Sequence, residues 1–460
     1  MKRIIKNIFS SNKKITEGDI TKNVISLATP LMIGAFLQST QSLVDMFWVG
    51  SLGPAAIAAV AMSGILMMLM FTIVSGIGMG AVSLVSKNMG ANNISGAQAC
   101  AHQALIFGIL LSFIAAILGI FFSGHFLSWL GAEKEIIAAG EDYLKILLLG
   151  NFTMILFLLS SSILQGAGDV INPMIFMVIA NLFNIVLDPI FIFGIGVKPM
   201  YTKGAAVATV IAQGVALFLA LRLFSQGSSK ICLTFSKIKL RLDIMRDILK
   251  VGVPTMLQMF FRSVMSMFII NIVAGFGIAA TAAFGIVMRI HINALLPAFA
   301  LGGAAATLMG QNLGAGNIER ARKSVWVATM INLILMFIAG VIFYNFSRAI
   351  MSLFTKDAQV IAIGSEFMRI SAFFYIFIAF GVVLNRALGG AGDTVVPMLI
   401  TFISLWGYLV PLAYYMAKYT SFGLRGIWWA VATSYALNGL LTLIWFEIGC
   451  WKKVRVKLYA

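Results

Sequence analysis

Residues 164–174 read LQGAGDVINPM, and the related stretch LGGAGDTVVPM follows at residues 388–398, at an offset of 224 residues. Further pairs at the same offset are Pro30 with Pro254, Gly53 with Gly277, Asn88 with Asn312, Gly90 with Gly314 and Asn93 with Asn317. Near the end of each half the offset slips to 222, as for Pro189 with Pro411. The chain therefore contains two copies of one structural repeat.

The composition is that of an integral membrane protein. Of 460 residues, 60% are hydrophobic and only 11% are charged, whereas about a quarter of a soluble domain is charged. Apolar runs of about 20 residues, the length that crosses ~30 Å of hydrocarbon, centre near residues 36, 67, 110, 152, 183, 213, 261, 293, 334, 375, 407 and 437. The runs are continuously apolar and do not alternate as barrel strands do. We predict an all-α protein with twelve transmembrane helices.

Basic residues predict the topology. They gather before the first apolar run, between the sixth and seventh, and after the twelfth, and the positive-inside rule places all three segments in the cytoplasm. Six spans return the chain to its starting side, so we expect a parallel repeat of two six-helix lobes around a central cavity. The expected segments are a cytoplasmic N-terminal arm (1–23), a first lobe (24–226), a basic cytoplasmic linker (227–247), a second lobe (248–450) and a cytoplasmic tail (451–460).

Several classes of function lack their residues. The formal charge of +17 lies in short segments between apolar runs, which argues against nucleic acid as a partner. The three cysteines and three histidines show no CxxC or HExxH spacing, there is no GxxxxGK[ST] phosphate loop, and no nucleophile stands at a suitable spacing from a base. We therefore expect no enzyme, no cofactor and no disulfide.

The two copies differ most where the first is polar. The repeat places four polar residues of the first half opposite apolar ones: Asp45 opposite Ile269, Asn184 opposite Trp406, Asp188 opposite Val410 and Thr209 opposite Val431. Because shared glycines and prolines indicate a shared fold, the function is expected where the copies diverge.

Two polar stripes arise from helical spacing. In the first apolar run Gln38, Gln41, Ser42 and Asp45 follow i, i+3, i+4, i+7 spacing, and in the fifth run Asn181, Asn184 and Asp188 do the same. Pro189 has no amide hydrogen, so the carbonyl of Ile185 loses its helical donor.

These groups are hard oxygen ligands, which suit Na⁺ or a proton shared between carboxylates. The alternative is that they only join helices by hydrogen bonds, which is the favoured interpretation for Asn181 or Ser42 alone. For Asp45 and Asp188 the functional interpretation is favoured, because a carboxylate at mid-membrane costs at least ~2.5 kcal/mol on insertion scales. We predict a cation site of Asp45, Asn184, Asp188 and Thr209.

The second half carries its own charges, Arg262 and Arg289. Arg262 aligns with Gln38, and four roles stay open for it: pairing with a carboxylate, repelling cations, extending to the membrane interface, or joining the two lobes. Met256 and Met259 could form an adaptable surface for apolar ligands. The candidate residues of the substrate cavity are Gln38, Gln41, Asn181, Met256, Met259 and Arg262.

Longer stretches resemble a known family. ATPLMIGAFLQSTQSLVDMFWVGSLGPAAIAAV (28–60), the LQGAGD and NRALGGAGD turns, NIVLDPIFIFGIG (184–196) and GAAVAT (204–209) together resemble the multidrug and toxic compound extrusion (MATE) family. The NxxxDP element with the aspartate of the first helix is similar to the DinF-like branch. The resemblance implies two lobes of six helices and export of organic, often cationic, compounds in exchange for Na⁺ or H⁺. It also adds the backbone carbonyl of Ala205 to the cation site.

The chain departs from relatives at two positions. In the NorM-like branch a glutamate on the seventh helix takes part in coupling, and Arg262 stands at the corresponding position here. Some relatives place an asparagine on the fourth helix, where this chain has Leu158. A cation site in the second lobe and a contribution from the fourth helix are therefore in doubt.

We expect a monomeric secondary active exporter of small-molecule drugs and organic cations in the lipid bilayer of a prokaryotic plasma membrane, with both termini in the cytoplasm. One alternative is a flippase for lipid-linked oligosaccharides of the same superfamily, although such proteins usually carry more cationic cavity residues and extra helices. The other is a passive channel, which two lobes with carboxylates in only one of them disfavour. The sequence leaves the choice between Na⁺ and H⁺ open.

Overall fold

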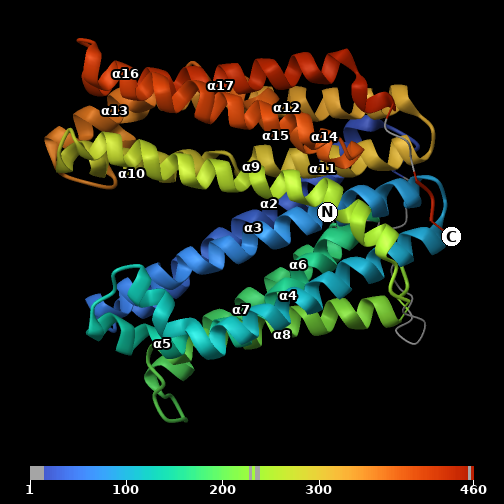
Figure 1. The fold of residues 1–460 in the computed structure, drawn as a ribbon, viewed down its shortest axis with the longest axis horizontal. Helices are drawn as coiled ribbons and strands as arrows, with labels where there is room; N and C mark the ends of the chain where they lie inside the picture. Colours follow the sequence, from blue (N-terminus) through green and yellow to red (C-terminus); the bar gives the residue numbers. More distant parts are fainter. Residues whose placement is uncertain (1–14, 227–229, 234–238, 454–456, 460) are drawn as a thin grey trace, which may run out of the picture. The chain divides into compact units, whose positions relative to one another are not determined.

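The computed structural model describes residues 15–226, 230–233, 239–453 and 457–459, and within these ranges it contains helices and no strands (Figure 1). The α-helices of the first half are α2 (Ile20–Gly50), α3 (Pro54–Gly90), α4 (Ile94–Trp129), α5 (Lys134–Leu149), α6 (Asn151–Gly166), α7 (Ile171–Phe193) and α8 (Thr202–Ser225). Those of the second half are α9 (Leu242–Ala274), α10 (Ile278–Ala294), α11 (Leu296–Gly314), α12 (Ile318–Ser352), α13 (Ala358–Ala372), α14 (Tyr375–Ala391), α15 (Val395–Phe402), α16 (Val410–Tyr419) and α17 (Gly423–Ile448), with a π-helical segment η2 (Ile403–Leu409) and a 3-10 helix η3 (Cys450–Lys453).

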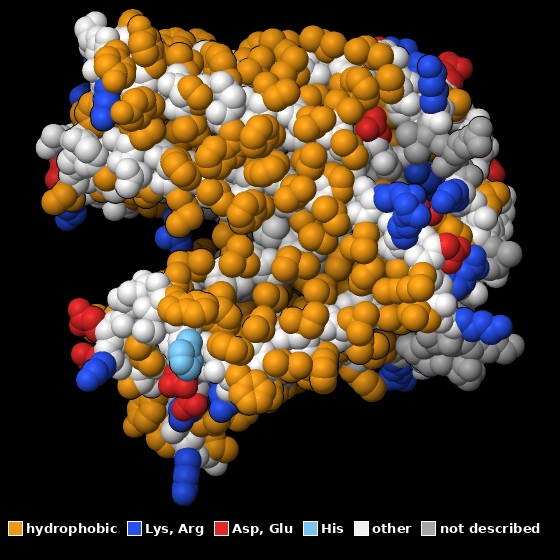
Figure 2. All heavy atoms as spheres, viewed as in Figure 1, with side chains coloured by type: hydrophobic (Ala, Val, Ile, Leu, Met, Phe, Trp, Pro, Cys, Tyr) orange, Lys and Arg blue, Asp and Glu red, His pale blue; other side chains and the backbone are white. Residues whose placement is uncertain are grey.

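The predicted set of twelve membrane helices is confirmed. Ten helical segments in the described residues are long and apolar enough to cross a membrane, and two bent pairs raise the number to twelve if each pair is one span. The bent pairs are α5 with α6, at 45°, and α13 with α14, at 63°. Hydrophobic side chains cover much of the helical surface in Figure 2, and charged side chains gather near helix ends. Such a surface suits a lipid environment.

The helix bounds follow the same offset as the repeat in the sequence. The helices α4, α5, α6 and α7 start 224 residues before α12, α13, α14 and α15, respectively. The LQGAGD and LGGAGD stretches form equivalent turns, in which Gly168 and Gly392 adopt left-handed φ values of 84° and 81°. The slip in offset occurs between Pro397 and Pro411, where η2 lies. Two missing residues would rotate the rest of an α-helix by about 200°, and the wider π turn is a local adjustment at that place.

The chain forms two compact units. Within the described residues, unit 1 holds 29–252 and 457–459, and unit 2 holds 15–28 and 253–453. The sequence instead predicted a basic linker (227–247) between a first lobe that ends at 226 and a second lobe that begins at 248. The boundary between the units lies inside α9, between residues 252 and 253. The helix itself runs without a break through Pro254. Most of the expected arm (1–23), and parts of the linker and tail, lie outside the described residues.

In unit 1 the helices that carry the polar stripes are held close together. The helix α7 packs along α8, and α6 packs against α3 and α8. At Gly204 a Cβ atom would lie only 2.5 Å from the backbone carbonyl carbon of Phe191, so α7 and α8 approach more closely than any other residue there would allow. This contact fixes Ala205, the next residue, beside the second half of α7.

Unit 2 contains an aromatic core. Phe367 stacks on Trp428 with ring centroids 4.2 Å apart and on Phe284 at 5.9 Å. His291 is buried among the rings of Phe343, Phe367 and Tyr375. Offset aromatic stacks of this kind add about 0.5–1.5 kcal/mol each beyond burial. The core ties α10, α12, α13, α14 and α17 into one body.

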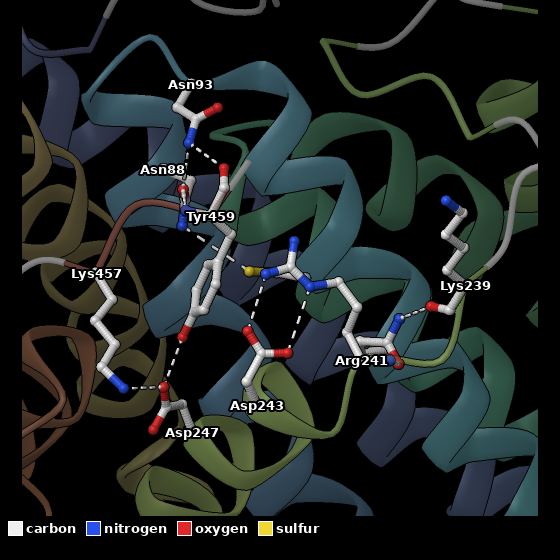
Figure 3. Close-up of polar contacts among 10 residues, drawn as sticks. Asn88, Asn93, Lys239, Arg241, Asp243, Asp247, Lys457 and Tyr459 are labelled. Carbon is white, nitrogen blue, oxygen red and sulfur yellow. Dashed lines mark hydrogen bonds and ion pairs between the residues drawn. The ribbon is translucent and has the colours of Figure 1, made fainter.

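The last described residues of the chain belong to unit 1 and pack against the start of α9 (Figure 3). The Tyr459 hydroxyl donates to Oδ2 of Asp247 at 2.8 Å, and Lys457 Nζ reaches the same oxygen at 2.8 Å. Asn93, the N-cap of α4, donates from Nδ2 to the Tyr459 carbonyl at 2.7 Å. The Arg241 guanidinium lies 5.7 Å from the centre of the tyrosine ring. The tail residues therefore join the start of α9 to the α3–α4 turn.

Candidate cation site

The site is built on α2 and α7 within unit 1. Asn184 and Asp188 are fully buried and stand one turn apart on α7, and Nδ2 of Asn184 donates to Oδ1 of Asp188 at 3.2 Å. Asp45, on α2, lies close enough to interact directly with both of them. The structure thus brings three of the predicted ligands together, as the two polar stripes implied.

Four buried oxygen atoms in this region have no hydrogen-bond donor. They are Oδ1 of Asp45, Oδ1 of Asn181, Oδ1 of Asn184 and Oδ2 of Asp188. A buried polar atom without a partner costs about 1–3 kcal/mol, and more when it is charged. All four atoms are acceptors, so a cation, a proton or a hydrogen-bond donor would satisfy them. This is the donor set that fits Na⁺ or H⁺.

Thr209 and Ala205 lie on α8, beside this group. The Thr209 hydroxyl donates to the Ala205 carbonyl at 2.9 Å, so the two predicted α8 ligands are bonded to each other. Ala205 packs against Val49 and Ile192, which places it between the ends of α2 and α7. No hydrogen bond joins the Thr209 hydroxyl to either aspartate. Ala205 therefore packs one turn beyond Asp45 on α2 and one turn beyond Asp188 on α7.

The candidate cavity residues fall in both units. In unit 1, Asn181 is buried and its Nδ2 donates to the Leu37 carbonyl at 2.8 Å, which joins α7 to α2. Gln38, next to Leu37, is exposed, and Gln41 is half-buried. In unit 2, Met256 and Met259 are half-buried and Arg262 is exposed.

Two neighbours of the carboxylate pair were not predicted. Tyr143 on α5 lies within electrostatic reach of Asp45 and Asp188. Trp48 stands one turn after Asp45, and its buried Nε1 has no acceptor. Extending the stripe on α2 by three residues would have found Trp48. No sequence pattern points to Tyr143, because only the packing of α5 beside this region brings it near.

The residues do not suit a transition metal. Among the described residues no three His, Cys, Asp or Glu side chains cluster as metal ligands, and all three cysteines are free thiols. Two carboxylates with neutral oxygens form a harder and less charged set than zinc sites use.

Comparison with known proteins gives one consistent family. The MatE family model matches residues 30–190 and 254–415, once in each half. The probable multidrug resistance protein NorM of Thermotoga maritima is 30% identical, covering 95% of this chain and 94% of the relative. The probable multidrug resistance protein YoeA of Bacillus subtilis is 28% identical, covering 96% and 97%. The structure of a MOP superfamily transporter from Pyrococcus furiosus is 27% identical with a TM-score of 0.88, covering 95% of this chain and 98% of that one.

Proposed function

This chain belongs to the multidrug and toxic compound extrusion (MatE) family of transporters, and we propose from this premise that it is a multidrug exporter driven by Na⁺ or H⁺. The observation that carries the coupling is the group of four unpartnered oxygens around Asp45 and Asp188. A cation that enters between the two carboxylates removes their mutual repulsion.

Coupling requires the cation and the drug to prefer different states of the transporter. Cation entry at Asp45 and Asp188 favours the inward return, and drug binding displaces the cation and favours outward release. Thr209 and the Ala205 carbonyl complete the coordination when the cation is bound. The transporter works as a monomer in the plasma membrane of a prokaryote, with both termini in the cytoplasm.

The test is efflux of ethidium from proteoliposomes under an imposed Na⁺ gradient or an imposed pH gradient. We expect one gradient to drive efflux in the wild type and Asp188→Asn to abolish this dependence. Asp142→Asn is the matched control, because Asp142 forms a half-exposed ion pair with Lys203 and such pairs contribute little. This control should keep the wild-type response.

Two other functions remain testable by the same preparation. A passive channel would release ethidium without gradient dependence and would show no counterflow. A flippase for lipid-linked oligosaccharides would leave ethidium inside and would move a fluorescent lipid-linked glycan between leaflets. Either result in the wild type would refute coupled export of organic cations.

A further inference from the structure

Among the arginines of unit 2 that have no acidic partner in the described residues, two lie within electrostatic reach of each other. Arg262 lies on α9 and Arg386 on α14, and no ion pair in the described residues includes either of them. Nε2 of Gln258 donates to Oδ1 of Asn385 at 3.1 Å, which joins the two helices. Arg262 follows Gln258 by one helical turn, and Arg386 follows Asn385 directly, so this bond brings the guanidinium groups into electrostatic reach of each other.

Arg386 is held in place by its neighbours. Its guanidinium lies 5.2 Å from the centre of the Phe299 ring, a cation–π contact. Its aliphatic part runs along Gly302, where a Cβ atom would lie 2.9 Å from Cδ of the arginine. Arg262 is exposed and Arg386 half-buried, so a ligand can reach both.

Near Arg262 and Arg386, the polar side-chain atom without a hydrogen-bond partner is a donor. Nδ2 of Asn385 is buried and has no acceptor. Asn385 precedes Arg386 on α14, and Tyr435 lies within electrostatic reach of Arg262. The cation site in unit 1 shows the reverse, because the atoms without partners there are oxygen acceptors.

The fold does not require these charges. The repeat offset of 224 residues places Gln38 opposite Arg262 and Ser162 opposite Arg386, so unit 1 builds the same helices with neutral residues. Two cations close together in a membrane protein repel each other and are costly to desolvate, and no acidic residue offsets that cost here. A ligand that carries negative charge would offset that cost.

We propose that Arg262, Arg386 and Asn385 form an anion-binding site that takes the phosphate or carboxylate group of an organic compound with an aromatic or apolar body. Guanidinium groups match both anions with paired N–H donors, and the Phe299 ring offers an apolar surface beside them. That the site receives a transported substrate rests on the export function proposed above, whereas binding itself can be tested without transport.

The experiment measures binding of 1-naphthyl phosphate to the purified full chain in a neutral detergent. We expect saturable binding that inorganic phosphate weakens and that 1-naphthol, the neutral analogue, does not reproduce. Arg262→Gln and Arg386→Gln should each weaken it roughly tenfold or more, the size of one charge-assisted hydrogen bond. Arg289→Gln, on α10, is the matched control and should leave the affinity unchanged.

Thermal unfolding separates lost binding from lost folding. Because the two guanidinium groups repel each other, either glutamine variant should unfold at the same or a higher temperature than the wild type. Competition then identifies the source of the anion. Displacement by phenyl phosphate supports a soluble compound, and displacement only by dihexanoyl phosphatidic acid supports a lipid headgroup.

Two results would overturn the proposal: no saturable binding to the wild type, or equal affinity in the double Arg262→Gln, Arg386→Gln variant. Neither result bears on ethidium export driven through Asp45 and Asp188. Conversely, loss of gradient-driven ethidium efflux would refute the proposed function and leave anion binding standing.

Discussion

At Asp188 the two carboxylate oxygens have different surroundings: Oδ1 accepts the Asn184 amide, and Oδ2 has no partner. One oxygen is thus held in position while the other is free to bind a cation. Asn184 also has two roles. Its amide nitrogen orients the carboxylate of Asp188, and its own Oδ1 has no hydrogen-bond partner. At the scale of single residues, the same two side chains hold each other in position and leave two oxygens for the proposed cation.

Replacing Asn184 by alanine should therefore weaken cation binding without blocking transport. We expect the Na⁺ or H⁺ concentration for half-maximal efflux to rise roughly tenfold, since one hydrogen bond to a charged group is lost, and the maximal rate to recover at saturation. Asn332→Ala is the control, because Asn332 is equally buried and only bonds the Ala379 carbonyl. Unchanged ion dependence in Asn184→Ala would remove this residue from the site.

At the scale of elements, Pro189 and the last described residues decide which polar groups of a helix have hydrogen-bond partners. Pro189 lies inside α7 and removes one backbone donor just after Asp188, so an acceptor is left on the helix that carries the carboxylate. At the last described residues, by contrast, polar groups of the helices gain partners. Tyr459, almost fully buried, links the start of α9 to the α3–α4 turn through Asp247 and Asn93.

Tyr459→Phe removes one buried hydrogen bond to a carboxylate, and we expect it to destabilise the protein by about 1–3 kcal/mol. Burial, with the hydrogen bond to Asp247 adding to it, raises the pKa of Tyr459 well above its usual range. A raised pKa means that the contribution is fully present below the ordinary tyrosine pKa of about 10 and is lost only above it.

The difference in thermal unfolding between wild type and Tyr459→Phe should therefore stay constant between about pH 6 and 9. Tyr414→Phe is the control, since that exposed tyrosine accepts only from Lys418. A difference that disappears within this pH range would mean that the Tyr459 hydroxyl does not form the bond to Asp247.

At the scale of the whole molecule, the two units share a fold and differ in charge. Unit 1 carries the carboxylates Asp45 and Asp188, and unit 2 carries Arg262 and Arg386, all four on helical segments apolar enough to cross a membrane. The shared fold sets how the helices pack, and the two units place groups of opposite charge on that one repeated scaffold. This difference in charge is what the two proposed sites rest on.

Coupled export makes a prediction about the molecule as a whole. If the ion lowers ethidium affinity by some factor, ethidium must lower ion affinity by the same factor, because linkage between two binding equilibria is reciprocal. Titrating ethidium at low and high ion concentration, and the ion with and without ethidium, measures both factors. We expect equal factors in the wild type and none in Asp188→Asn. A wild type in which neither ligand affects the other would contradict exchange.

The sequence alone predicted the fold, and it selected polar residues that the structure brings together. Hydropathy is a local property, so the apolar runs predicted the twelve helices, and the repeat offset showed two copies of one unit. Helical spacing brought Asn184 and Asp188 onto one face, and divergence between the copies selected them together with Asp45. These features depend only on neighbours along one helix or on the comparison of two copies.

What only the tertiary structure decided involves residues far apart in the chain. Tyr143 reaches the carboxylates because α5 packs beside them, and Arg386 meets Arg262 because Gln258 bonds Asn385 across 127 positions. The docking of Tyr459 on Asp247 spans 212 positions. No local pattern encodes such pairs, since each depends on how whole helices pack. The sequence therefore determined which groups the membrane must accommodate, and the packing of the helices decided which of them meet.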